Sequence, residues 1–181
     1  MTDTEQLLAR VTSEARATRP WGWDSLPAPV DADALARAED ALGFRLPPLL
    51  AALYTRVGDG GFGPEYGLLP LLEGKSSAGE PAAVEKYLGM RGSEQGWPEG
   101  VLPISHWGCA MYACVDCRTD TAQVLLFEPN GGDPRHMWFV DSPSLASWLT
   151  SWLDGTGWYE EDNDDPDLPS WQDEHARVRP A

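Results

Sequence analysis

The chain has 181 residues, with 13 Lys and Arg against 29 Asp and Glu, so its formal net charge is −16. A chain of this length is expected to form one compact domain with a short appendage, and its core needs neither disulfides nor a structural metal. The negative charge repels phosphate backbones and anionic membranes, so it disfavours direct binding to nucleic acid or membrane. It either attracts a basic protein partner or simply keeps the protein soluble.

Neither the first residues of the chain nor its cysteine usage predicts export. Residues 1–20 lack a basic segment followed by an apolar one, and no apolar run approaches the roughly 20 residues that cross a bilayer. The chain contains 3 cysteines, an odd number, and all of them lie between positions 109 and 117. This is the wrong distribution for a secreted disulfide framework, so we expect a cytoplasmic protein with reduced thiols.

Three helices are predicted near the start of the chain. Residues 4–17 carry apolar side chains at helical spacing, and Pro20 prevents continuation. A second helix is placed between Asp31, which can cap it, and Gly43, which can end it. The segment LPPLLAALYTRVG, residues 46–58, predicts a shorter third helix because its prolines suit a first turn.

From Gly67 onward, short apolar runs are separated by Gly, Pro and Asp, which is typical of strands. Strands are expected in YGLLPLL, VLPIS, CAMYACVD, QVLLFE and MWFVD, and EPNGGDP has the turn chemistry of a hairpin connection. A final helix is predicted with Ser142 as its cap, Pro143 in its first position and Gly155 at its end.

The stretch CAMYACVDC, from Cys109 to Cys117, has the spacing of the first three ligands of a plant-type iron–sulfur cluster, but the chain has no fourth cysteine. On a strand, Cys109 and Cys114 would point to opposite faces and could not share a metal. Adding His106 gives the best zinc pattern, yet the usual paired CxxC motifs are missing. We interpret the cysteines as small apolar side chains, and expect no metal, no cofactor and no catalytic residue.

The stretch GDGGFG, residues 58–63, matches the letters of a dinucleotide-binding fingerprint. That fingerprint follows a strand and opens a helix, whereas this stretch follows a predicted helix and precedes a predicted strand. We therefore interpret it as a structural turn whose glycines supply positive φ angles or room for close backbone approach. The turn residues are Gly58, Gly60, Gly61, Phe62 and Gly63.

The chain is also rich in tryptophan, with 9 residues. Those in predicted strands or the last helix are expected in the core: Trp107, Trp138, Trp148 and Trp152. Others lie in Pro-rich or acid-rich segments, where they either anchor a partner or cover the edges of the domain itself: Trp21, Trp23, Trp158 and Trp171.

The C-terminal residues 158–181 carry 8 acidic and 2 basic side chains, a net charge of −6, which leaves −10 for residues 1–157. A dense acidic run with prolines predicts a mobile or loosely docked tail. The run lacks the glycine and the closing glutamate of an EF-hand, so no specific calcium site is expected. We place the domain at residues 1–157 and an acidic tail at 158–181.

Residues 38–71, AEDALGFRLPPLLAALYTRVGDGGFGPEYGLLPL, resemble the signature of the SUKH superfamily, also described as the Smi/Knr-type cell-wall-assembly regulator domain. The matching positions are Glu39, Leu42, Gly43, Leu46, Pro47, Tyr54, Gly60, Gly61, Phe62 and Gly63. VLPISHWGCAMYACVD and QVLLFEPNG are similar to its central strands, and SPSLASWLTSWLDG to its closing helix, so the resemblance covers about residues 28–155.

The resemblance implies a single α+β domain with a central, mostly antiparallel sheet flanked by helices, and a non-enzymatic role without cofactor. Bacterial members are similar to immunity proteins that neutralise a cognate polymorphic toxin, frequently a nuclease, while fungal members act as regulatory scaffolds. The first role is our leading hypothesis, because an acidic protein can cover the basic surface of a nuclease. A regulatory or cell-wall-related scaffold is the alternative, and a zinc- or thiol-dependent enzyme is the third.

The tail supplies the candidate toxin-binding residues, as acidic groups with two aromatic anchors. They are Trp158, Tyr159, Glu160, Glu161, Asp162, Asp164, Asp165 and Asp167.

Overall fold

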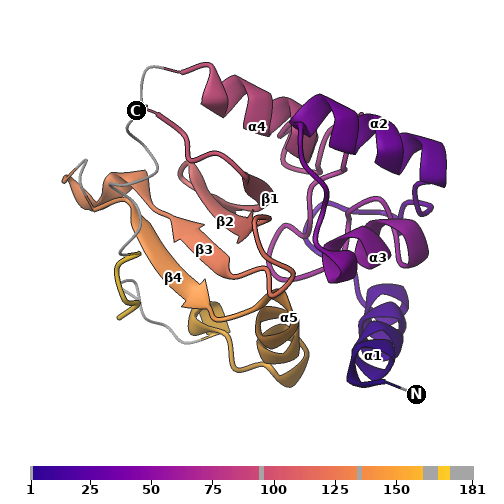
Figure 1. The fold of residues 1–181 in the computed structure, drawn as a ribbon. Coiled ribbons are helices and arrows are strands. Elements are labelled where there is room, and N and C mark those ends of the chain that lie inside the picture. Colours follow the sequence, from indigo (N-terminus) through magenta and orange to yellow (C-terminus); the bar gives the residue numbers. More distant parts are fainter. Residues whose placement is uncertain (1, 94–95, 134–135, 161–166, 172–181) are drawn as a thin grey trace.

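The computed structural model describes residues 2–93, 96–133, 136–160 and 167–171 (Figure 1). The elements in chain order are α1 (Asp3–Ala17), α2 (Ala32–Leu42), α3 (Pro48–Arg56), α4 (Ala83–Arg91), β1 (Val101–Gly108), β2 (Met111–Asp116), β3 (Val124–Phe127), η1 (Pro129–Gly131), β4 (Trp138–Ser142), α5 (Leu145–Asp154) and η2 (Trp158–Glu160).

The strands form one sheet in the order β1-β2-β3-β4, and each neighbouring pair is antiparallel. Every residue of β3 is buried, and β3 is an interior strand, between β2 and β4. The predicted α+β class with a central antiparallel sheet is therefore confirmed.

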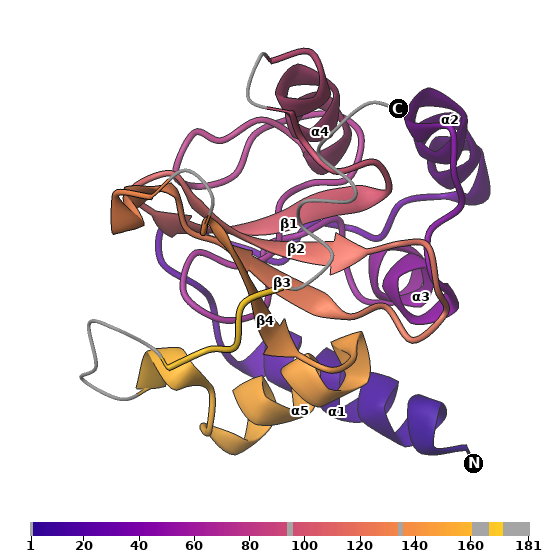
Figure 2. The same cartoon turned by 60° about the vertical axis from the view of Figure 1, so that its left-hand side comes forward.

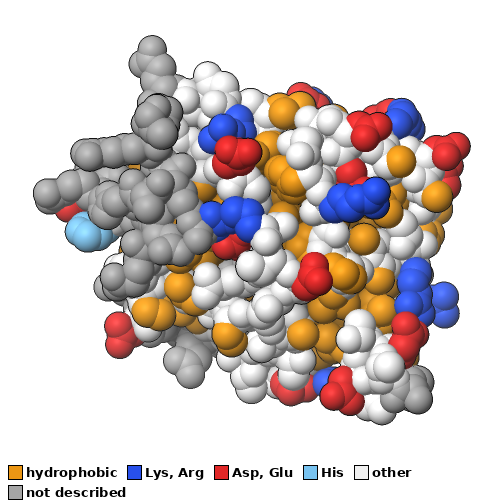
Figure 3. Space-filling model, in the orientation of Figure 1, with side chains coloured by type: hydrophobic (Ala, Val, Ile, Leu, Met, Phe, Trp, Pro, Cys, Tyr) orange, Lys and Arg blue, Asp and Glu red, His pale blue; other side chains and the backbone are white. Residues whose placement is uncertain are grey.

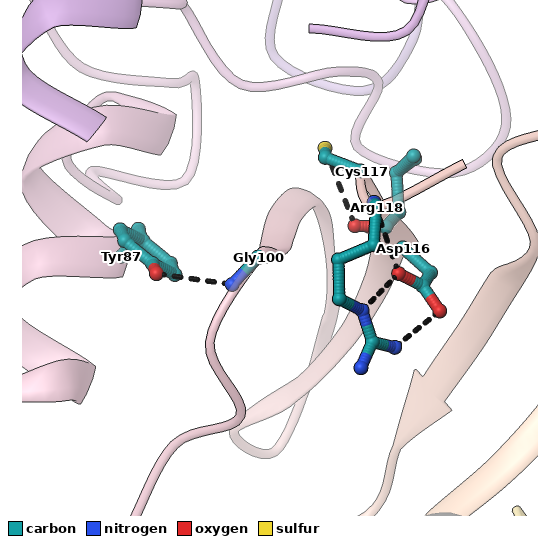
Figure 4. Close-up of polar contacts among 6 residues, drawn as sticks. Tyr87, Gly100, Asp116, Cys117 and Arg118 are labelled. Atoms are coloured by element: carbon teal, nitrogen blue, oxygen red, sulfur yellow. Dashed lines mark hydrogen bonds and ion pairs between the residues drawn. The ribbon is translucent and has the colours of Figure 1, made fainter. Parts of the chain in front are cut away.

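The helices pack against both ends of this strand order. α4 contacts β1, α5 contacts β4, and α1 lies beside α5 (Figure 2). Tyr87 of α4 accepts a hydrogen bond from the backbone N–H of Gly100, at 3.2 Å, just before β1 begins (Figure 4). In the core, the hydroxyl of Tyr54 donates to the carbonyl of Leu69 at 3.0 Å, so this buried phenol has the partner that burial requires.

The predicted helix ends are correct for α2 and shifted for α5. The side chain of Asp31 accepts from the N–H of Ala34 at 2.7 Å, and Gly43 ends α2 with φ +79°. In α5 the cap is Ser144, whose hydroxyl accepts from the N–H of Ser147 at 3.0 Å. The predicted cap, Ser142, is instead the last residue of β4 and pairs with Val124.

Two strand predictions need correction. The run YGLLPLL forms only a single bridge, between Leu68 and Ser105, because Pro70 has no N–H to continue the ladder. CAMYACVD is a strand only from Met111, since Cys109 and Ala110 make the turn between β1 and β2 with φ +47° and +63°.

Helix α4 was not expected from the sequence. Its N-cap is Ala82, which offers no side-chain hydrogen bond, and Gly89 lies inside the helix. The sequence therefore has neither a capping residue nor a clear apolar period that would predict this helix. Its stability comes from packing on β1 and α2 instead.

The four tryptophans expected in the core differ in how deeply they are buried. Trp138 and Trp148 are buried as predicted, whereas Trp107 and Trp152 are only partly buried. Among the helices built from described residues, none combines the length and the apolar character needed to cross a membrane.

Candidate functional site

The first part of the tail packs back onto the sheet. In η2, the indole Nε1 of Trp158 donates to Oδ2 of Asp141, in β4, at 3.0 Å. The ring of Trp107, in β1, lies 5.2 Å from the ring of Trp158 and 4.8 Å from that of Tyr159. Trp158 and Tyr159 are consequently half-buried against the domain rather than free to insert into a partner.

A second attachment follows further along the tail, where Ser170 forms an antiparallel bridge with Phe139 of β4 (Figure 2). The N–H of Val140 donates to the carbonyl of Pro169 at 2.8 Å. Trp171 is 5% exposed and its ring lies 5.7 Å from that of Trp138. These residues add a short strand-like segment to β4, and Trp171 covers the edge of the domain itself.

The acidic candidates lie between these two attachments in the sequence. Glu160 and Asp167 are exposed. Four candidates lie outside the described residues: Glu161, Asp162, Asp164 and Asp165. The acidic run therefore starts and ends beside the same strand, β4.

Next to η2 is a depression of about 270 Å³, which we call the Asp141 pocket. Its lining residues are Asp141, Ser142, Trp148, Ser151, Thr156, Gly157, Trp158, Tyr159 and Leu168. It is built from the end of β4, one face of α5 and the tail. Sequence reasoning missed it, because only folding brings the tail against the end of β4.

The carboxylate of Asp141 has an unusual environment. Burial raises its pKa, although hydrogen bonds from the Trp158 indole and the Ser142 hydroxyl favour the charged form and oppose the shift. Within the described part of the chain, no Lys, Arg or His side chain forms an ion pair with it. The buried hydroxyl of Tyr159 likewise has no hydrogen-bond partner among the described residues.

The predicted turn follows α3 and brings the chain back toward β1. Gly60 and Gly61 have φ +77° and +72°, in the left-handed region that favours glycine. A Cβ on Gly60 would lie 2.5 Å from the carbonyl oxygen of Leu68, and one on Gly61 would lie 2.7 Å from Pro27. Of the other turn residues, Gly58 packs on Leu26 and Pro27, Gly63 has φ +109° and Phe62 is buried.

The cysteines are dispersed by the fold. Cys109 is exposed in the β1–β2 turn, Cys114 is fully buried in β2, and Cys117 follows β2. The Cys117 thiol donates to the carbonyl of Val115 at 3.5 Å, beside the ion pair of Asp116 and Arg118 (Figure 4).

Burial raises the pKa of both the Cys114 and the Cys117 thiols. Thiols of raised pKa stay protonated near neutral pH, when they are poor nucleophiles and poor metal ligands. Among the described residues, no three His, Cys, Asp or Glu side chains converge as a metal site.

His106 instead belongs to a polar cluster that the sequence did not reveal. Glu80 accepts from the Tyr112 hydroxyl at 2.8 Å and from Nζ of Lys86 at 2.7 Å, and Nε2 of His106 lies 3.9 Å from it. Burial opposes ionisation of Glu80, but the hydrogen bonds from Lys86 and Tyr112 outweigh it and lower its pKa. Burial lowers the pKa of His106, and its buried Nδ1 has no hydrogen-bond partner among the described residues, so the paired part of the cluster is Glu80 with Lys86 and Tyr112.

The face in Figure 3 carries interspersed acidic and basic side chains with hydrophobic ones between them, and no continuous acidic patch. Several acidic side chains of the domain form ion pairs with basic ones, such as Glu5 with Arg56 at 2.9 Å and Asp154 with Arg10 at 2.6 Å. An acidic surface for a partner has to be sought elsewhere, and the tail has the densest run of acidic residues in the sequence.

Comparison with known proteins gives one result. A search of the curated proteins found no match. The SMI1 / KNR4 family (SUKH-1) matches residues 29–151, from just before α2 into α5, so the tail and its two attachments lie beyond the matched region. With most of its length matched and the α+β architecture present, the chain belongs to the SMI1 / KNR4 family (SUKH-1).

Proposed function

We propose that this protein is a non-enzymatic immunity protein that binds a basic toxin of the nuclease type and neutralises it with its acidic C-terminal region. Immunity proteins are found among members of its family. The net charge of −16 supports attraction to a basic protein and repulsion of nucleic acid.

One observation carries the proposal: the acidic run between Glu160 and Asp167 is bracketed by two attachments to β4. Trp158 bonds Asp141 on one side of the run, and Pro169 bonds Val140 on the other. A run attached at both ends costs less conformational entropy to order on binding than a free tail of the same composition. This anchoring favours a binding role over mere solubilisation of the chain.

The proposed inhibition follows from electrostatics. A nuclease must present a basic surface to hold phosphates, and an acidic run that covers this surface excludes the substrate. Association of such oppositely charged proteins is fast at low salt and slows as salt screens the attraction.

The experiment begins with capture of a basic protein from the native cells and its purification. Affinity for the captured protein and protection against its nuclease activity are then measured for the wild type and for a variant with six acids neutralised to Gln or Asn: Glu160, Glu161, Asp162, Asp164, Asp165 and Asp167. We expect the neutralised variant to bind at least about tenfold more weakly, with a smaller dependence of affinity on salt.

A charge-matched control removes six acids that are exposed on the rest of the domain: Asp24, Asp33, Asp40, Glu85, Glu99 and Asp120. The control variant should keep most of the affinity, because the proposal assigns binding to the tail. If both variants lose the same affinity, net charge explains the effect and the position of the acids in the tail does not. A captured partner that has no toxic activity would favour the scaffold alternative.

A further inference from the structure

We propose that the Asp141 pocket receives an arginine or lysine side chain of the basic partner, so that the tail aromatics form the walls of a receptor site rather than protruding anchors. This inference rests on the proposed function and names the contact by which the partner is recognised. It reverses the expected role of Trp158 and Tyr159, since both are already packed on Trp107.

The first argument is the carboxylate of Asp141. Its donors are all neutral: the Trp158 indole and the Ser142 hydroxyl, each at 3.0 Å, and more weakly the Trp148 indole, which also favours the charged form. A carboxylate offers about four acceptor positions, so capacity remains for further donors. Removing a carboxylate from water is costly unless a cation compensates, and none of the described basic side chains forms an ion pair with this partly buried one.

The second argument is the composition of the pocket walls. Aromatic rings come from Trp148 and Trp158, and hydroxyls come from Ser151 and Thr156. A guanidinium or ammonium group is attracted to aromatic faces, and it donates hydrogen bonds to carboxylate and hydroxyl oxygens. The same lining disfavours an anion, because Asp141 would repel it.

The third argument is the surrounding charge. Glu160 follows Tyr159 directly and is exposed, and the negative charges of Glu65 and Glu160 both act on the Tyr159 hydroxyl. Together with Asp141, these two carboxylates make the electrostatic potential around Tyr159 negative. With a volume of about 270 Å³ the pocket is large enough for the head of one basic side chain.

The test uses methylguanidinium chloride as the probe, added to the full-length protein at constant ionic strength. Binding is followed by the indole ¹H–¹⁵N signals of Trp158 and Trp148, with the first assigned through Trp158→Phe. We expect saturable shifts of both signals. Asp141→Asn, which keeps an oxygen acceptor for the Trp158 indole, should weaken the affinity at least about tenfold.

Two further variants sharpen the result. Asp120→Asn removes one exposed charge away from the pocket lining and should change the affinity less than about threefold. Ser151→Lys places a cation on the α5 wall, where the serine hydroxyl has no recorded hydrogen bond within the described structure, and should abolish the methylguanidinium response. If Asp141→Asn unfolds the chain, the loss of binding in folded Ser151→Lys alone supports the site.

The proposal is overturned if methylguanidinium shifts neither indole signal, or if Asp141→Asn and Asp120→Asn weaken binding equally. It is also overturned if Asp141→Asn leaves the affinity for a captured basic partner unchanged. Failure of the proposed function is distinguishable, because it would appear as an unchanged partner affinity after neutralising the acidic run while the methylguanidinium titration still reports on the pocket.

Discussion

Gly60 is the residue at which backbone and packing constraints are most severe. A Cβ there would meet the carbonyl oxygen of Leu68 at 2.5 Å, and φ is +77°. We predict that Gly60→Ala lowers the free energy of unfolding by about 2–4 kcal/mol, measured by urea denaturation, because left-handed strain adds to a clash with rigid backbone.

Gly43→Ala is the matched control. Gly43 has nearly the same angle, φ +79°, but nothing lies within 4 Å of its added Cβ. Only the conformational cost remains, about 1 kcal/mol. Similar losses in the two variants would mean that the turn relaxes around the added methyl group.

Asp141 leads to a prediction about pH. Because burial raises its folded pKa above the ordinary 3.8, the ionised carboxylate is disfavoured in the folded state. Its favourable contribution to stability is present below pH 3.8 and is lost as the pH rises through the folded pKa. The stability of Asp141→Asn relative to the wild type should therefore increase between about pH 3 and pH 7.

Unfolding curves measured across this range, with Asp120→Asn as a variant that loses the same charge at an exposed position, test the prediction. A relative stability of Asp141→Asn that falls as the pH rises would show that an unrecognised cation pairs with the carboxylate.

The turn of the β1–β2 hairpin has backbone strain that substitutions can relieve. Gly108 pairs with Met111, so Cys109 and Ala110 form a two-residue turn in which both φ angles are positive. This type I′ geometry favours Asn-Gly. The double variant Cys109→Asn, Ala110→Gly should raise the free energy of unfolding by about 1–2 kcal/mol in urea denaturation.

The Asn130 side chain donates to the backbone carbonyl of Cys109 at 2.8 Å, and this contact does not depend on the Cys109 side chain. Asn130→Ala should destabilise the wild type and the Asn-Gly variant by the same amount. An Asn-Gly variant no more stable than the wild type would argue against strain in this turn.

The elements that could be predicted from sequence carry their own local signals. Asp31 and Gly43 bound α2 through a cap and a left-handed glycine, and both effects act within a few residues. α4 has no such signal and depends on contacts with β1, which follows it in the chain. The YGLLPLL segment is as apolar as a strand but is buried as a loop, since Pro70 interrupts its pairing.

At the scale of the whole molecule, the negative charge should oppose folding. The net charge is −16, and folding brings the excess acidic side chains closer together. They repel one another in the folded state, and salt screens this repulsion. We predict that the urea midpoint rises when NaCl increases from about 20 mM to about 500 mM, where the Debye length falls below about 5 Å.

The variant with six neutralised tail acids provides the comparison. Its midpoint should rise less with salt, because part of the repulsion is already gone. If salt lowers the midpoint of the wild type, the surface ion pairs, such as Arg10 with Asp154, outweigh the excess negative charge.

Only part of the candidate site could be predicted from the sequence. The acidic run and Trp158 stand out by composition, because charge density needs no knowledge of the fold. The hydrogen bond between Trp158 and Asp141 joins residues 17 positions apart, with α5 between them in the chain. The contact between the rings of Trp171 and Trp138 spans a still longer separation. Such contacts follow from tertiary packing, which a single sequence does not encode at short range.

The extra strand-like segment at Pro169–Trp171 has an evolutionary consequence. Since it and η2 hold the two ends of the acidic run, residues inserted between them leave both attachments intact, and each doubling of a loop costs only about 0.6 kcal/mol. If the run binds a partner as proposed, related chains can change their specificity by substitutions or insertions in this short segment, outside the matched family region, without altering the domain that carries it.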